Sequence, residues 1–325
     1  MKNTIEFSGA LLALPQDAGA DNLPGTIYLA NASSRFTDST FSEPLTAFAQ
    51  GWDDPEDLRG QLARIAPDVP VGRRFEFKKT DNSADFLSET DDVRAIDAPF
   101  KRIEFRGETV SDRTYNKGLT VRLDKDGEGA VPGAEQRAVR RLMKRLFRNE
   151  LLRAITALNA AATMSSKTWN ASSDPHGDLL ALINASGDVI GIDPNRLLIG
   201  RSAWIKAALA LRATDKKAGE TANLTPEQLA AWLGIDDIIS IKARRATSKT
   251  TKAALLGNKV IAFLAEPDLS TDDPSSIKRF VTPVDAEAGV RVHVQDYPKY
   301  IDVSVEHYSN IVATSTLGVL GHDIS

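Results

Sequence analysis

The longest regular stretch of this chain is Pro132–Thr163, which reads PGAEQRAVRRLMKRLFRNELLRAITALNAAAT. After Gly133 it contains neither Gly nor Pro, and its apolar side chains recur at steps of three and four residues, the spacing of one helical face. These apolar residues are Val139, Leu142, Met143, Leu146, Phe147, Leu151, Ala154, Ile155, Leu158 and Ala162. We therefore predict a single helix roughly 45 Å long, because each helical residue adds about 1.5 Å.

The other face of the predicted helix is basic, with Arg137, Arg140, Arg141, Lys144, Arg145, Arg148 and Arg153. Glu150 differs, because it falls on the apolar stripe between Phe147 and Ala154. An unpaired buried charge costs several kcal/mol, so we expect Glu150 to be paired. Two interpretations of the basic face remain open. It is either a solvated face or a face that meets nucleic acid or a neighbouring subunit.

The composition limits the class of protein. The chain has 325 residues, of which 42% are hydrophobic and 26% charged, with a net charge of −4. This allows a sizeable core, and the length indicates two domains or one domain with large extensions. No apolar run is long enough for a membrane span and the N-terminus lacks a secretory pattern, so we expect cytoplasmic synthesis and no membrane partner. The absence of cysteine excludes disulfides, thiolate zinc sites and cysteine nucleophiles.

The chain before the long helix contains an acidic segment between two alternating segments. Residues 1–50 are weakly patterned and form either a disordered tail or an extended arm. Arg73–Lys78 and Lys101–Arg106 alternate as strands do. The polar segment between them carries Asp81, Asp85, Glu89, Asp91, Asp92 and Asp97. We interpret 73–106 as a two-stranded flap that lies on another surface, since an isolated hairpin is barely stable.

The chain after the long helix changes from mixed structure to strands. Helical and strand patterns alternate over residues 175–265, which indicates an α/β unit. Residues 290–306 predict an antiparallel pair with one solvent-exposed face, joined to an earlier strand near 119–123. His293 falls on the polar face of that pair, so we expect a surface histidine. The basic segment Lys242–Lys252 is interpreted as a solvated loop in preference to a phosphate site.

No pattern in the sequence indicates catalysis. The four histidines lack close metal-ligand spacing, and phosphate-loop and dinucleotide motifs are missing. The nucleophile motif G-x-S-x-G is also missing. We therefore expect no catalytic residues, no cofactor and no metal, and predict that the chain is not an enzyme.

The order of the segments resembles a known family. Three portions of the chain look like successive parts of the major capsid protein of tailed bacteriophages. The first is Asp57–Phe77, and the second is the helix that carries Glu150 with the following Trp169–Pro175. The third is Asp193–Trp204 with Thr225–Ile235. This resemblance spans roughly 55–310 and implies an α+β protein with the Hong Kong 97-type capsid fold. The implied division is an N-terminal arm at 1–54, a peripheral (P) domain at 55–72, 107–172 and 288–313 with the spine helix at 134–163, an E-loop at 73–106, an α/β axial (A) domain at 173–287 and a C-terminal tail at 314–325.

The resemblance also implies a function. The chain would self-assemble through hexamers and pentamers into the icosahedral head shell that encloses phage double-stranded DNA, and would be located in the virion after synthesis in the host bacterial cytoplasm. Implied partners are scaffolding and portal proteins and non-specific packaged DNA. The acidic flap would lie across a neighbouring subunit, oriented by spine arginines. Candidate assembly contacts are Asp85, Glu89, Asp91, Asp92, Arg137, Arg141, Lys144, Arg148 and Glu150.

Two alternatives remain. The same fold builds encapsulin compartments, which enclose enzymes instead of DNA. From another class, the chain could be a non-specific DNA-binding protein that uses the basic helix, although this leaves the acidic flap without a role.

Overall fold

The computed structural model describes residues 40–52, 54–79, 93, 108–214, 224–266, 275–283 and 289–325. All helices and strands named below lie within Phe41–Ser325, one of the two units into which the chain divides. Within the described residues, no helix combines the length and apolar character needed to cross a membrane.

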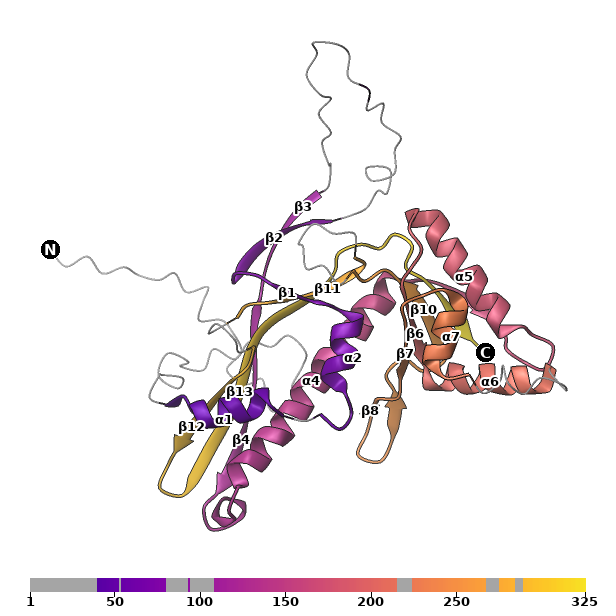
Figure 1. Ribbon diagram of the computed structural model, residues 1–325. Helices are drawn as coiled ribbons and strands as arrows, with labels where there is room; N and C mark the ends of the chain where they lie inside the picture. The colour runs from indigo at the N-terminus through magenta and orange to yellow at the C-terminus, as the bar shows by residue number, and fades with distance from the viewer. Residues whose placement is uncertain are drawn as a thin grey trace, which may run out of the picture. The chain divides into compact units, whose positions relative to one another are not determined.

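Helix α4 (Ala134–Ala161) confirms the predicted long helix and is drawn in magenta in Figure 1. It follows Gly133, whose positive φ of 73° favours glycine, and ends two residues before Thr163. Its apolar stripe is buried from Ala134 to Leu158. The long helix therefore forms as its periodicity predicts.

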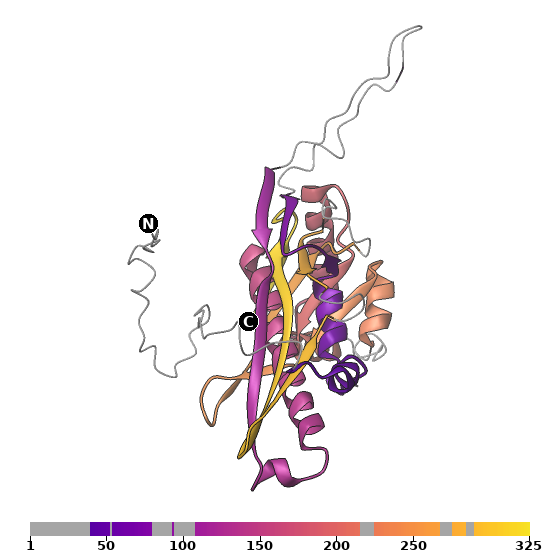
Figure 2. The ribbon, with the colours of Figure 1, turned by 90° about the vertical axis from the view of Figure 1, so that its left-hand side faces the viewer.

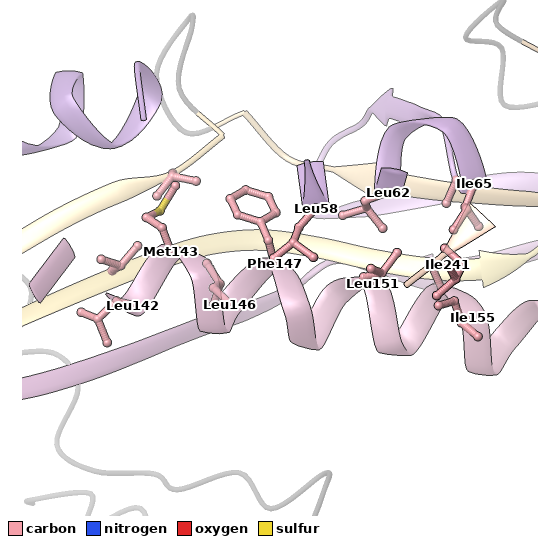
Figure 3. Packing of buried hydrophobic residues seen from close by; sticks show 14 of the residues in the cluster. Leu58, Leu62, Ile65, Leu142, Met143, Leu146, Phe147, Leu151, Ile155 and Ile241 are labelled. Atoms are coloured by element: carbon pink, nitrogen blue, oxygen red, sulfur yellow. The ribbon is translucent and has the colours of Figure 1, made fainter. Parts of the chain in front are cut away.

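Two short helices, α1 (Glu43–Gln50) and α2 (Leu58–Ile65), pack against α4. Figure 3 shows Leu58, Leu62 and Ile65 of α2 directed toward α4, where Phe147, Leu151 and Ile155 lie. The apolar face of α2 thus completes the core on one side of α4.

The first sheet has β13 (Tyr300–Ala313) at its centre. Antiparallel neighbours of β13 are β4 (Tyr115–Asp124), β12 (Arg291–Asp296) and β11 (Ile277–Val281), and β1 (Asp68–Pro70) runs parallel to β11. The predicted antiparallel pair at 290–306 is confirmed, and so is its junction with the strand near 119–123. Helix α4 packs against β13 and β4 of this sheet.

The predicted exposed face of this sheet is largely covered, which corrects the expectation for His293. Only 4% of His293 is exposed, and Asp302 and Ser304 are also buried. The reason is that the polar side chains of this face pair across strands: Arg122 donates to Asp302 at 2.9 Å, and the hydroxyls of Thr120 and Ser304 lie 2.8 Å apart. The ring of Phe41 lies edge-on to His293.

The second sheet has the strand order β5 (Thr163–Lys167), β14 (Leu320–Ile324), β10 (Lys259–Phe263), β6 (Arg196–Gly200) and β7 (Asp237–Ile241). Helices α5 (Pro175–Ile190), α6 (Arg201–Thr214) and α7 (Pro226–Leu233) pack on one face. The opposite face joins the core around α4 through Leu198, Ile239 and Ile261. Burial on both faces explains the continuous apolar runs of these strands.

Residues 314–325, for which we expected a tail, include strand β14. This strand is antiparallel to β10 and parallel to β5. A Cβ atom at Gly321 would lie 2.5 Å from Met164 Sδ and 2.7 Å from the Val260 carbonyl oxygen, so glycine is needed where the three strands meet. The strand was not predicted because its five residues are too few, and too weakly hydrophobic, to show a clear alternation.

The described residues also contain two separate two-stranded sheets, which we call ribbons. Strand β2 (Arg74–Lys79) confirms the predicted strand at 73–78, and its antiparallel partner is β3 (Glu108–Arg113). The predicted partner at 101–106 lies outside the described residues. The basic segment expected as a loop contains a second ribbon, β8 (Arg244–Ala246) with β9 (Lys252–Ala254). A short 3-10 helix, η4 (Glu128–Ala130), precedes α4.

Candidate functional site

Glu150 of α4 is completely buried and is paired, as predicted. Lys117 Nζ of β4 donates to its Oε1 atom at 3.0 Å, and Ser309 Oγ of β13 donates to its Oε2 atom at 2.8 Å. Arg153, one turn further along α4, also donates to Oε1. The carboxylate therefore joins the helix to two strands of the first sheet.

A second layer of polar groups surrounds Glu150. Arg279 Nε of β11 lies 3.6 Å from Glu150 Oε2, and Arg279 also donates to both carboxylate oxygens of Asp68 at 2.8 Å. His307 Nε2 lies 3.7 Å from Glu150 Oε2 and 3.0 Å from Ser309 Oγ. Through Arg279 the cluster reaches β11 and the start of β1.

Burial and charge set the protonation states of this cluster. Burial alone would raise the pKa of Glu150, but His307, Lys117 and Arg279 outweigh that effect and hold the pKa well below its ordinary value. Burial lowers the pKa of His307, against the attraction of Glu150. Burial also lowers the pKa of Lys117, and Glu150 counteracts this. At neutral pH the ionised Glu150 therefore has Lys117 and Arg279 as its cations.

The partners of Glu150 were missed by the sequence analysis, although one signal for them exists. Lys117 lies two residues before Leu119 and continues its every-second-residue pattern with Val121 and Leu123. His307 and Ser309 continue the same kind of pattern after Val303 and Val305. All of these side chains share the sheet face that packs on α4, because strand side chains alternate. Polar residues at core-facing positions were the signal.

All four candidate spine cations have partners within their own chain. Arg137 donates to the carbonyl oxygens of Pro132 and Val131, and Arg141 lies 3.1 Å from Glu128. Lys144 and Arg148 both pair with Glu56, and Lys144 is the main reason that the pKa of Glu56 is lowered. The structure therefore brings Glu56, Lys144 and Arg148 together beside α4.

The four acidic candidates, Asp85, Glu89, Asp91 and Asp92, lie outside the described residues, and their contacts stay a prediction. The root of the flap is described. Phe75 and Phe77 of β2 pack against Phe280 of β11, with ring centroids 4.2 and 5.4 Å apart. Among the described residues, no group of three His, Asp or Glu side chains is placed to hold a metal ion.

The chain is similar to several solved structures. Its similarity to a phage-related protein from Bordetella bronchiseptica RB50 covers 87% of this chain and 97% of that chain, with 18% identity and a TM-score of 0.67. The similarity to a virus-like particle from Pyrococcus furiosus covers 87% and 98%, with 12% identity and a TM-score of 0.50. The similarity to the capsid of cyanophage P-SCSP1u covers 80% and 86%, with 9% identity and a TM-score of 0.50.

The chain has the Hong Kong 97-type capsid fold. We refer to α4 as the spine helix and to the β2–β3 ribbon as the E-loop root, after the parts that the resemblance implies. No family model and no curated protein matches the sequence. The Glu150 cluster is thus the polar junction between the spine helix and the sheet that carries the E-loop root.

Proposed function

We propose that this chain is the major capsid protein of a tailed bacteriophage and that its copies assemble into the icosahedral shell around double-stranded DNA. The observation that carries the proposal is the fold, which matches a phage-related protein over 97% of that chain. A capsid and a virus-like particle are also among the similar structures. The proposed role is structural and not enzymatic.

The E-loop root supports an intersubunit role for the flap. Within the described residues β2 pairs only with β3, and the three phenylalanines Phe75, Phe77 and Phe280 attach the ribbon to the first sheet. A two-stranded ribbon gains little stability by itself. A neighbouring subunit would supply the additional surface, and the acidic side chains Asp85, Glu89, Asp91 and Asp92 would orient the flap on it.

The remaining assignments follow from the proposed function. Hexamers and pentamers would be the building units, scaffolding and portal proteins would be partners, and the virion would be the location. The arm, P domain, E-loop, A domain and tail would follow the boundaries that the resemblance implies. Since Lys144 and Arg148 share the carboxylate of Glu56, the contribution of these two cations to an intersubunit contact would be reduced.

Electron microscopy tests the proposal. The full-length chain, purified by size-exclusion chromatography, would be imaged in negative stain alone and with a candidate scaffolding protein. Closed shells, tubes or isolated hexamers and pentamers are expected. A strictly monomeric species under both conditions would contradict the proposal and favour the DNA-binding alternative. Shells that co-purify with an enzyme instead of DNA would favour the encapsulin-like compartment.

A further inference from the structure

Five basic side chains without a side-chain partner among the described residues gather on the β8–β9 hairpin. Lys242–Ala254 contains five cations and no Asp or Glu, in a chain whose net charge is −4. All five cations are exposed, and none of their side chains forms a hydrogen bond or ion pair with another described residue: Lys242, Arg244, Arg245, Lys249 and Lys252. This contrasts with the spine helix, where Arg137, Arg141, Lys144 and Arg148 are all engaged.

The register of the hairpin places cations on both of its faces. Arg244 pairs with Ala254 and Ala246 pairs with Lys252, so Arg244 and Lys252 share one face. Arg245 pairs with Ala253 on the opposite face, because side chains alternate along a strand. Lys249 lies in the connecting turn. Both faces therefore carry cations, and the hairpin packs on the core at its base, through Ala243.

Hydroxyl groups hold the turn of the hairpin in place. Ser248 Oγ accepts hydrogen bonds from the backbone N–H groups of Thr250 and Thr251 at 3.3 and 3.0 Å. The Thr247 and Thr251 hydroxyls lie 2.9 Å apart. Figures 1 and 2 show the hairpin extending beyond the second sheet, away from α6 and α7. The hydrogen bonds within the turn therefore help to hold the conformation of the hairpin.

The composition of the hairpin distinguishes between two kinds of partner. Protein interfaces are enriched in aromatic residues, Met and Arg and depleted in Lys, Ser and Ala. Lys242–Ala254 has no aromatic residue, no Met and no large aliphatic residue, and consists of Lys, Arg, Ala, Ser and Thr. Arg, Lys, Ser and Thr side chains are those that contact phosphate oxygens of nucleic acids. Phosphate is therefore the better match.

We propose that the β8–β9 hairpin binds the phosphate backbone of double-stranded DNA without reading its sequence. A two-stranded ribbon fits the DNA major groove, and cations on both faces reach the phosphate rows on either side. This inference rests on the proposed function, in which the shell encloses DNA, and it assigns the contact to this hairpin instead of the spine helix. Binding would depend strongly on salt, because each phosphate contact releases counterions.

The test compares two variants of the full-length, unassembled chain with equal loss of charge. The hairpin variant is Arg245→Gln/Lys249→Gln/Lys252→Gln. The control is Arg145→Gln/Arg201→Gln/Lys299→Gln, which removes three exposed cations elsewhere. Fluorescence anisotropy would measure binding to two labelled DNA duplexes of unrelated sequence at several salt concentrations. Poly-glutamate would serve as a polyanion without phosphate.

We expect the hairpin variant to bind both duplexes at least about tenfold more weakly and the control to bind within about twofold of the natural chain. The slope of log affinity against log salt should fall by up to about 3 in the hairpin variant only. Equal affinities of hairpin variant and natural chain, no DNA binding by the natural chain, or an equal loss in the control would overturn the inference. So would poly-glutamate binding as tight as DNA binding.

Electron microscopy of the same variants separates this inference from the proposed function. The hairpin variant should form the same assemblies as the natural chain while binding DNA more weakly. A hairpin variant that loses assembly and keeps full DNA affinity would show that the hairpin contacts another copy of the chain, against the inference. A natural chain that never assembles but shows hairpin-dependent DNA binding would contradict only the proposed function.

Discussion

Lys117 Nζ donates a hydrogen bond to Glu150 Oε1 at 3.0 Å, and the Glu150 side chain is completely buried. The contact joins β4 to the spine helix, and Ser309 adds β13 to the same carboxylate. A buried carboxylate is stable only with its cations and hydrogen-bond donors in place. This junction therefore favours one position of the first sheet along α4.

Removing the carboxylate should destabilise the protein. Glu150→Ala leaves the largely buried Lys117 without its carboxylate and Arg279 with Asp68 alone, and we expect the free energy of unfolding to fall by about 3–5 kcal/mol. Denaturant titration measures this change. The matched control is Glu128→Ala, which breaks the exposed pair with Arg141 and should cost less than about 1 kcal/mol. Unchanged thermal melting and normal particles in Glu150→Ala would remove the proposed role of this residue.

Acidification should weaken the fold partly through His307. The pKa of His307 is lowered in the folded state. The contribution of the neutral imidazole to the free energy of unfolding is therefore complete above the unfolded pKa of about 6.5 and is lost as pH falls toward the folded pKa. His307→Gln should therefore reduce the fall in unfolding free energy below pH 6.5, by at most about 1.4 kcal/mol per pH unit. Tyr308→Phe on the same strand is the control, with the natural slope. Identical pH slopes for His307→Gln and the natural chain would contradict this assignment.

Glu150 predicts a second, more acidic transition. Its folded pKa is depressed, so its stabilising contribution is present above the unfolded pKa of about 4.3 and is lost as pH falls through the folded value. Between about pH 5 and 2 the natural chain should lose unfolding free energy faster than Glu150→Gln. Acid titration followed by circular dichroism measures both curves. Parallel curves over this range would show that Glu150 is not ionised in the folded protein.

Reversing charge on the acidic flap should impair assembly more than folding. In Asp91→Lys/Asp92→Lys we expect fewer closed particles by electron microscopy with a nearly unchanged melting temperature, because the flap would contact a neighbouring subunit through complementary charge. Asp126→Lys/Asp188→Lys makes the same charge change at two exposed positions elsewhere. If folding fails together with assembly, the flap is not an intersubunit element.

The E-loop root should depend on its phenylalanine contacts. Phe77→Ala removes a ring that is 3% exposed and packs on Phe280, and we expect a loss of about 3 kcal/mol in unfolding free energy. Hydrogen exchange should show reduced protection in β2 and β3 with little change in α4. Val131→Ala, at a half-exposed position, serves as the control. Equal loss of protection in α4 would mean that the ribbon is not a locally anchored unit.

Local periodicity explains which elements were predicted correctly. The extent of α4 follows from apolar residues three and four positions apart, and the strands at 290–306 follow from alternation, because both patterns depend on near neighbours in the chain. The burial of His293 could not be predicted this way. It depends on Phe41 and Glu306, which only the folded sheet brings beside it.

By itself the sequence determined that α4 forms, which of its faces is buried, and that Glu150 on that face needs partners. The tertiary structure decided that these partners are Lys117, Ser309 and Arg279, and that β14 lies between β5 and β10. Alternation assigns a side chain to one face of a strand, but the register between distant strands sets which residue meets which. That register results from packing over the whole core, and no local pattern in the sequence records it.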